Sequence, residues 1–98
     1  MKTTHVLTEN AHDDVIKAML WEEARHAGLG EKLLRCIDET IGQICKSPLG
    51  YASKYRNTRE KKVNKFPYQI IYTVENKIVY IHAVFPCKDD PQKKYKNL

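Results

Sequence analysis

The chain has 98 residues, of which 42% are hydrophobic and 30% are charged, and this length and balance suit a single globular domain over residues 1–98. No apolar run approaches the roughly 20 residues of a membrane span, and the N-terminus has no signal-like stretch, so we expect a cytoplasmic protein that does not enter a membrane. The three cysteines are an odd set without a C-x-x-C pair, which argues against a disulfide framework and against a zinc site.

The front half predicts one strand and two helices. Residues 4–7, THVL, are typical of a short strand, and Thr8 is a helix N-cap residue type. Apolar positions spaced by three and four predict a helix from Ala11 to about His26, with Gly28 as its stop. The segment "GLGEKLLRCIDETIGQICKSP" has one apolar face and predicts a second helix that Pro48 ends. Because the connection is very short, the two helices form an antiparallel hairpin.

The back half predicts a cationic segment followed by strong strands. The end of the cationic segment resembles a strand with Val63 turned inward. Two further strands, "YQIIYTV" and "IVYIHAVF", are rich in β-branched and aromatic residues, and "ENK" joins them as a tight hairpin turn. Residues from about 86 to 98 form a polar basic tail. The order β-α-α-β-β-β predicts an α+β fold, with an N-terminal strand, the helical hairpin, and a three-stranded antiparallel meander whose one face carries the helices.

Alternation along the strands predicts which side chains lie under the helices. In the last strand we expect Val79, Ile81, Ala83 and Phe85 there, and Val84 on the opposite, open face. The open face would then be polar and partly aromatic, with these residues: Lys62, Asn64, Gln69, Thr73, Tyr80 and His82.

The charges are divided unevenly along the chain. Residues 1–45 hold five Lys or Arg against eight acids, giving −3, whereas residues 46–98 hold twelve against four, giving +8. This asymmetry predicts an acidic or polyanionic partner for the back half, and a solvated basic face is an equally good interpretation of the charge alone. The cations that we assign to such a partner are Lys54, Arg56, Arg59, Lys61, Lys62, Lys65 and Lys88.

The order of these elements resembles the RelE/ParE toxin superfamily of bacterial type II toxin–antitoxin systems. The segments that carry the likeness are "GLGEKLLRCIDETIGQICKSPLGY", "KFPYQIIYTVENKIVYIHAVF" and the ending "CKDDPQKKY", and it extends over about residues 3–95. A basic residue, Phe, Pro and Tyr open the strand at residue 68, which resembles the ParE branch. The resemblance implies a small basic toxin that a cognate, acidic antitoxin wraps and neutralises in a hetero-oligomer.

The resemblance implies one of two activities. ParE-like members poison DNA gyrase and have no established catalytic residues, whereas RelE-like members cleave messenger RNA in the ribosomal A site without a metal. The RelE-like site uses two lysines, two arginines and a tyrosine. These positions fall here on Lys62, Asn64, Gln69, Lys88 and Tyr95, so that two of the cations are lost and a lysine replaces one arginine.

Three functional hypotheses follow. The missing cations favour a ParE-like inhibitor of gyrase that acts by protein binding. The alternative is a RelE-like ribosome-dependent endoribonuclease that uses Lys62, His82, Lys88 and Tyr95, with His82 as a general base. A third hypothesis is an inactive relative that binds only the antitoxin. None of the three implies a cofactor or a metal.

Overall fold

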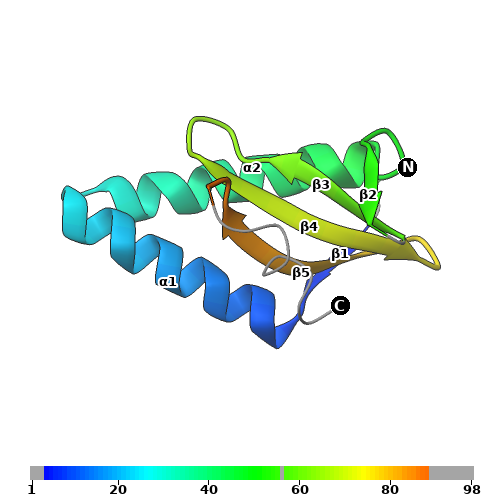
Figure 1. The fold of residues 1–98 in the computed structure, drawn as a ribbon, viewed down its shortest axis with the longest axis horizontal. Helices are drawn as coiled ribbons and strands as arrows, with labels where there is room; N and C mark the ends of the chain where they lie inside the picture. Colours follow the sequence, from blue (N-terminus) through cyan, green and yellow to red (C-terminus); the bar gives the residue numbers. More distant parts are fainter. Residues whose placement is uncertain (1–3, 56, 89–98) are drawn as a thin grey trace.

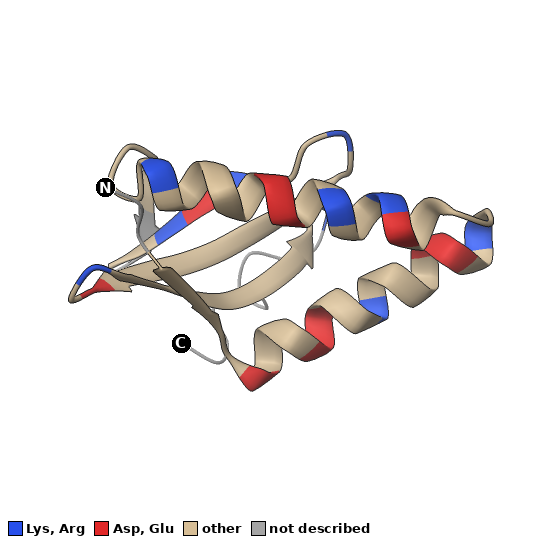
Figure 2. Ribbon diagram, turned by 180° about the vertical axis from the view of Figure 1, so that it is seen from behind, with Lys and Arg blue, Asp and Glu red and all other residues tan. Residues whose placement is uncertain are grey.

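The fold is that of a computed structural model, which describes residues 4–55 and 57–88. Two helices lie on one face of a five-stranded sheet of order β1-β5-β4-β3-β2 (Figure 1). The helices are α1 (Glu9–Arg25) and α2 (Leu29–Lys46). The strands are β1 (Thr4–Leu7), β2 (Ser53–Tyr55), β3 (Thr58–Lys62), β4 (Tyr68–Glu75) and β5 (Ile78–Pro86). Acidic and basic residues are interspersed along both helices (Figure 2).

The predicted α+β fold is confirmed, with two additions at the sheet edges. The helical hairpin and the antiparallel meander of β3, β4 and β5 are present. The first addition is β2, a three-residue strand that pairs with β3 at one edge. The second is the position of β1, which pairs parallel to β5 at the other edge. The sheet is therefore mixed, with a single parallel pair in the described part of the chain.

The N-termini of the two helices are capped in different ways. Thr8 caps α1 as predicted, because its hydroxyl accepts a hydrogen bond of 3.2 Å from the Ala11 amide. Gly28, expected to stop the first helix, instead serves as the N-cap of α2 with a φ of 92°. It has no side chain for capping, and the Glu23 carboxylate accepts hydrogen bonds of 3.0 Å from the amides of Gly28 and Gly30 instead. The end of α1 thus supplies the anionic cap of α2.

A β-bulge at His82 changes the alternation along β5. Ile71 pairs with Ala83 while the next residue of β4, Tyr72, pairs with Ile81, so His82 has no opposite residue. The carbonyl of His82 accepts hydrogen bonds from the side chains of Thr8 (3.3 Å) and Asn10 (3.0 Å) at the start of α1. These hydrogen bonds join the bulged backbone to the start of α1.

The bulge overturns part of the predicted strand alternation. Val79 and Ile81, before it, are fully buried in the core as expected. Val84, expected on the open face, is 3% exposed and belongs to the core cluster, whereas Phe85 is only half-buried and outside that cluster. One extra residue shifts the side-chain period by one and so exchanges the two faces.

The β4–β5 hairpin turn forms without glycine. Asn76 and Lys77 have φ values of 51° and 65°, the left-handed pair that a two-residue type I′ turn requires. The predicted "ENK" turn is confirmed.

No helix among the described residues is long and apolar enough to cross a membrane. Within residues 4–55 and 57–88, no three His, Cys, Asp or Glu side chains gather closely enough to hold a metal ion.

Candidate functional site

Two of the cations assigned to an anionic partner are engaged within the chain. Arg59 and Lys61 pair across the sheet with Tyr72 and Ile70, which places their side chains on the helix side. The Arg59 guanidinium donates a hydrogen bond to the Tyr51 carbonyl, and the Lys61 ammonium lies 5.0 Å from the centroid of the Tyr51 ring. Both cations therefore hold the segment between α2 and β2.

Tyr72 contacts the same segment between α2 and β2. Its hydroxyl donates a hydrogen bond of 2.8 Å to the Pro48 carbonyl. Burial raises the pKa of Tyr72 to about 12, against the opposing effect of the Arg59 charge. The phenol therefore stays protonated at neutral pH and acts as a structural donor.

The remaining described cations gather near one end of the sheet. Lys62 is exposed and pairs with Gln69, which in turn pairs with Phe85. Lys65, in the turn before β4, and Lys88, just after β5, are also exposed near this end. Lys62 is therefore the cation of the open face at this end, with Lys65 and Lys88 in the flanking turns, and Gln69 stands between Lys62 and β5.

His82 lies on the same open face, away from that basic end. Its Nε2 atom shares a hydrogen bond of 2.8 Å with the Thr73 hydroxyl. Lys62 is two strands from β5, about 10 Å at the usual strand spacing, and His82 lies three residues, about 10 Å, further along β5 than Phe85. Lys62 and His82 therefore form no direct pair.

The environment of His82 keeps its ring neutral near pH 7. Burial lowers the pKa of His82, and the charge of Glu75 partly opposes this effect. A neutral imidazole can accept a proton, as a general base requires.

Three predicted site residues cannot be placed in this geometry. Lys54 belongs to β2, but its side chain is outside the described part of the structure. Arg56 and Tyr95 both lie outside the described residues. Their assigned roles stay predictions.

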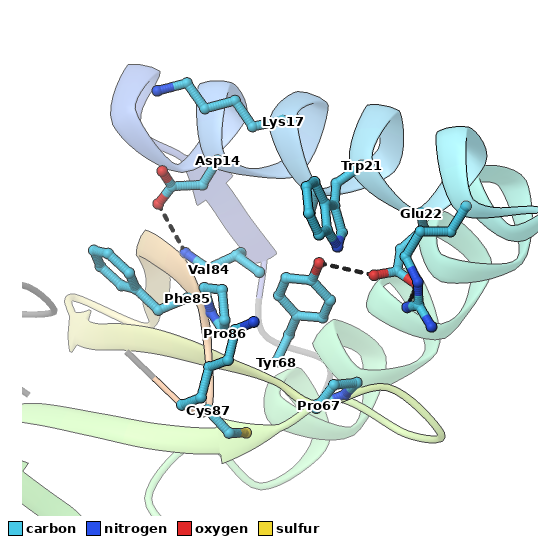
Figure 3. A pocket seen from close by; sticks show the side chains of 13 residues that line it. Asp14, Lys17, Trp21, Glu22, Pro67, Tyr68, Val84, Phe85, Pro86 and Cys87 are labelled. Carbon is cyan, nitrogen blue, oxygen red and sulfur yellow. Dashed lines mark hydrogen bonds and ion pairs between the residues drawn. The ribbon is translucent and has the colours of Figure 1, made fainter. Parts of the chain in front are cut away.

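The structure contains a groove that the sequence analysis did not predict. It has a volume of about 690 Å³ and lies between α1 and the neighbouring ends of β4 and β5 (Figure 3). Trp21 forms one wall and is 60% exposed. Across from it are Pro67, directly before β4, and Pro86 at the end of β5. Aromatic and proline side chains thus frame an apolar opening.

Two carboxylates of α1 lie in this groove and accept hydrogen bonds from the chain itself. Glu22 is 3% exposed, and its two oxygens accept hydrogen bonds from the Tyr68 hydroxyl (3.1 Å) and the Arg25 guanidinium (3.0 Å) (Figure 3). Asp14 accepts a hydrogen bond of 3.0 Å from the Val84 amide. Burial raises the pKa of Asp14, although this hydrogen bond favours its ionised form.

Helical periodicity could not single out the groove. Ala18 and Glu22 belong to the buried face of α1, whereas Trp21 lies beside that face and is exposed. The usable signal was the combination of a Trp at the edge of an apolar face with a Glu inside it, since a buried Glu needs a partner. That partner, Tyr68, is 46 residues away and invisible to local patterns.

Solved structures of toxin–antitoxin proteins share this fold. Neither the protein-family models nor the curated proteins contain a match to this chain. A chain of the chromosomal ParDE TA system from P. aeruginosa superposes with a TM-score of 0.76 and 15% identity, covering 87% of this chain and 96% of that chain. A chain of the RelBE2 toxin–antitoxin complex from Mycobacterium tuberculosis superposes with a TM-score of 0.62 and 18% identity, covering 88% of this chain and 99% of that chain. A chain of the intact E. coli RelBE toxin–antitoxin complex superposes with a TM-score of 0.61 and 16% identity, covering 89% of this chain and 99% of that chain.

These likenesses define the class of fold. The chain has the RelE/ParE toxin fold over nearly its whole length, which confirms the fold that the sequence resemblance implied. Because the identities are 15–18%, they establish the fold and leave the activity to be argued from the residues.

Proposed function

We propose that this chain is the toxin of a type II toxin–antitoxin pair, that a cognate antitoxin neutralises it, and that it inhibits DNA gyrase as ParE-like toxins do. The fold likeness to a chain of the ParDE system carries the proposal. Binding to an antitoxin is supported by the RelBE complexes that share the fold. The more specific part of the proposal, inhibition of gyrase, rests on the chemistry of the open face.

The open face is poorly equipped for RNA cleavage without a metal. Such a reaction needs several cations around one scissile phosphate, because negative charge develops on its oxygens in the transition state. Gln69 and Asn64 stand where the resemblance places cations, and Lys62 has no direct contact with His82. These features favour a toxin that acts by binding.

The test is expression of the chain alone in a bacterial host, followed over time by incorporation of labelled thymidine and labelled methionine. We expect DNA synthesis to stop before translation, and co-expression of the antitoxin from a neighbouring reading frame to restore growth. Purified protein should inhibit supercoiling by gyrase and trap cleaved plasmid. Normal supercoiling at a large excess of the protein would contradict the gyrase proposal.

The RelE-like alternative is favoured by one observation, the neutral His82 on the same face as the exposed Lys62. Under this alternative we expect translation to stop before DNA synthesis, and messenger RNA to be cleaved at ribosomes. The combined variant Lys62→Ala and His82→Ala would then abolish the arrest. The matched control, Lys32→Ala with His12→Ala, changes the same residue types at exposed positions on the helices. Harmless expression of the unaltered chain would favour the inactive relative.

A further inference from the structure

The groove beside α1 has an apolar floor and an open mouth (Figure 3). Ala18, Tyr68 and Val84 line it and are 6%, 5% and 3% exposed, so they belong to the core. Trp21 stands beside them with 60% of its surface exposed. An exposed Trp at the edge of a concave apolar surface is typical of the anchor residues of protein interfaces.

The rim of the groove is positively charged. Lys17 and Lys88 are exposed, and the side chain of Arg25 is 59% exposed. Glu22 forms an ion pair of 3.0 Å with Arg25 and so offsets that charge, and Asp14 accepts a hydrogen bond from the Val84 amide. The positive charge of the rim therefore comes from Lys17 and Lys88. An occupant would therefore meet an apolar floor surrounded by cations.

We propose that this groove binds an acidic segment of a partner protein, with a large apolar side chain resting on Trp21 and Tyr68 and acidic side chains near Lys17 and Lys88. Within the proposed function, the segment belongs to the antitoxin, and the inference rests on that function only for the partner's identity. The groove is lined by α1 and by the strand ends on the side of the core, separate from Thr73 and His82 on the open face. Capture of the partner and contact with the cellular target would then use different surfaces, with Lys88 at the boundary between them.

Charge complementarity favours this occupant over two others. Residues 89–98 of the same chain hold three lysines against Asp89 and Asp90, a net charge of +1, so the cations of the rim would not attract this segment as they would an acidic one. In a symmetric contact between two copies, the basic rim of one groove would face the basic rim of the other.

Trp21 is the only tryptophan in the sequence, so its fluorescence reports directly on the groove. The probe is a synthetic tryptophan-free peptide in which glutamates flank a leucine and a phenylalanine, titrated into the full-length chain. We expect a blue shift of the emission as water leaves the indole, and weaker binding at higher salt. A peptide with lysines in place of the glutamates should produce no shift.

Charge reversal at the rim tests the electrostatic part. Lys17→Glu combined with Lys88→Glu should weaken peptide binding about tenfold or more, from the loss of two exposed ion pairs with added repulsion. The matched control is Lys32→Glu with Lys46→Glu, which changes the net charge equally at exposed positions of α2 and should leave binding unchanged.

Several outcomes would overturn the proposal. The first is that the Trp21 emission does not change at peptide concentrations up to about 1 mM. The second is that the lysine peptide binds as tightly as the glutamate peptide. The third is that the two double variants lose the same amount of affinity for the glutamate peptide. A blue shift with single-stranded DNA or RNA instead of the peptide would assign the groove to a nucleic acid. A red shift on truncation after Lys88 would assign it to the chain's own tail, and a shift with protein concentration would assign it to a second copy. None of these measurements depends on toxicity, so failure of the proposed function leaves this test intact.

Discussion

Glu23 shows how a single side chain can join two helices. Its carboxylate accepts hydrogen bonds from the amides of Gly28 and Gly30, and these bonds lower the pKa of Glu23. The close approach requires glycine at position 30, because a Cβ there would lie 2.8 Å from the Met19 carbonyl oxygen and 3.1 Å from a Glu23 carboxylate oxygen. The tight connection between α1 and α2 therefore depends on Gly30.

Two glycines of α2 are expected to respond oppositely to alanine. Gly30→Ala should lower the free energy of unfolding by about 1–3 kcal/mol, because backbone must move to admit the methyl group. Gly42→Ala meets nothing within 4 Å and should raise the free energy of unfolding by roughly 0.5–1 kcal/mol through helix propensity. Urea denaturation measures both. Equal effects of the two substitutions would show that the helices do not approach as described.

His82 should make stability depend on pH. Its pKa in the folded state is lowered from 6.5, so as the pH falls through 6.5 the unfolded chain binds a proton that the folded chain does not. Stability is therefore lost as the pH falls toward the lower folded pKa. We expect the difference in urea midpoint between about pH 7.5 and about pH 5.5 to shrink in His82→Gln. The exposed-histidine control His12→Gln should keep the full difference, and a full difference in both variants would refute this role of His82.

At the scale of elements, the junction of β1 and α1 is tied to β5. The Thr8 amide donates a hydrogen bond of 3.0 Å to the Ile81 carbonyl, and the Thr8 and Asn10 side chains donate to the His82 carbonyl. These bonds come at the point where β5 carries its bulge. The N-terminal strand, the first helix and the last strand therefore form one connected unit.

Removing the Thr8 hydroxyl should weaken this unit. Thr8→Ala should cost about 1 kcal/mol or somewhat more, because the N-cap of α1 and the bond to β5 are both lost. Thr8→Ser keeps the hydroxyl and should retain most of the stability. Equilibrium unfolding compares the two, and an equal loss in both variants would assign the effect to the missing methyl group instead.

At the scale of the whole molecule, the two sides differ in chemistry. The open face of the sheet carries Lys62, Gln69, Thr73 and His82, whereas the groove on the side of α1 is apolar with a cationic rim. Large exposed hydrophobic side chains outside an interface are a liability for a free protein, and Trp21 and Leu20 are 60% and 67% exposed on α1. A partner that covers α1 would remove this liability.

A growth assay tests this division. If the groove captures the antitoxin, cells that express Trp21→Ala should need more antitoxin than cells with the unaltered toxin to resume growth. The control is Leu49→Ala, which removes another exposed hydrophobic side chain (67% exposed) away from the groove. Equal antitoxin requirements for all three proteins would contradict the assignment of the groove.

Local sequence patterns were sufficient for the elements themselves. The strand at residues 4–7, the Thr8 cap, both helices and the β4–β5 hairpin were predicted, because a 3.6- or two-residue period and turn chemistry depend on near neighbours. The short strand β2 was missed, since a three-residue edge strand has too few residues to show a period. Among site residues, the exposure of Lys62 and the open-face position of His82 were predictable from alternation up to the bulge.

Only the tertiary structure decided how these elements meet. β1 pairs in parallel with β5, and the bulge at His82 is joined to Thr8, a residue 74 positions away. The groove depends on Glu22 and Tyr68, which are 46 residues apart. The engagement of Arg59 and Lys61 by Tyr51 likewise follows from strand register. Sequence periodicity records which face of an element is apolar, but the partner of a buried polar group is set by packing between distant segments, and in this protein those partners shape the groove.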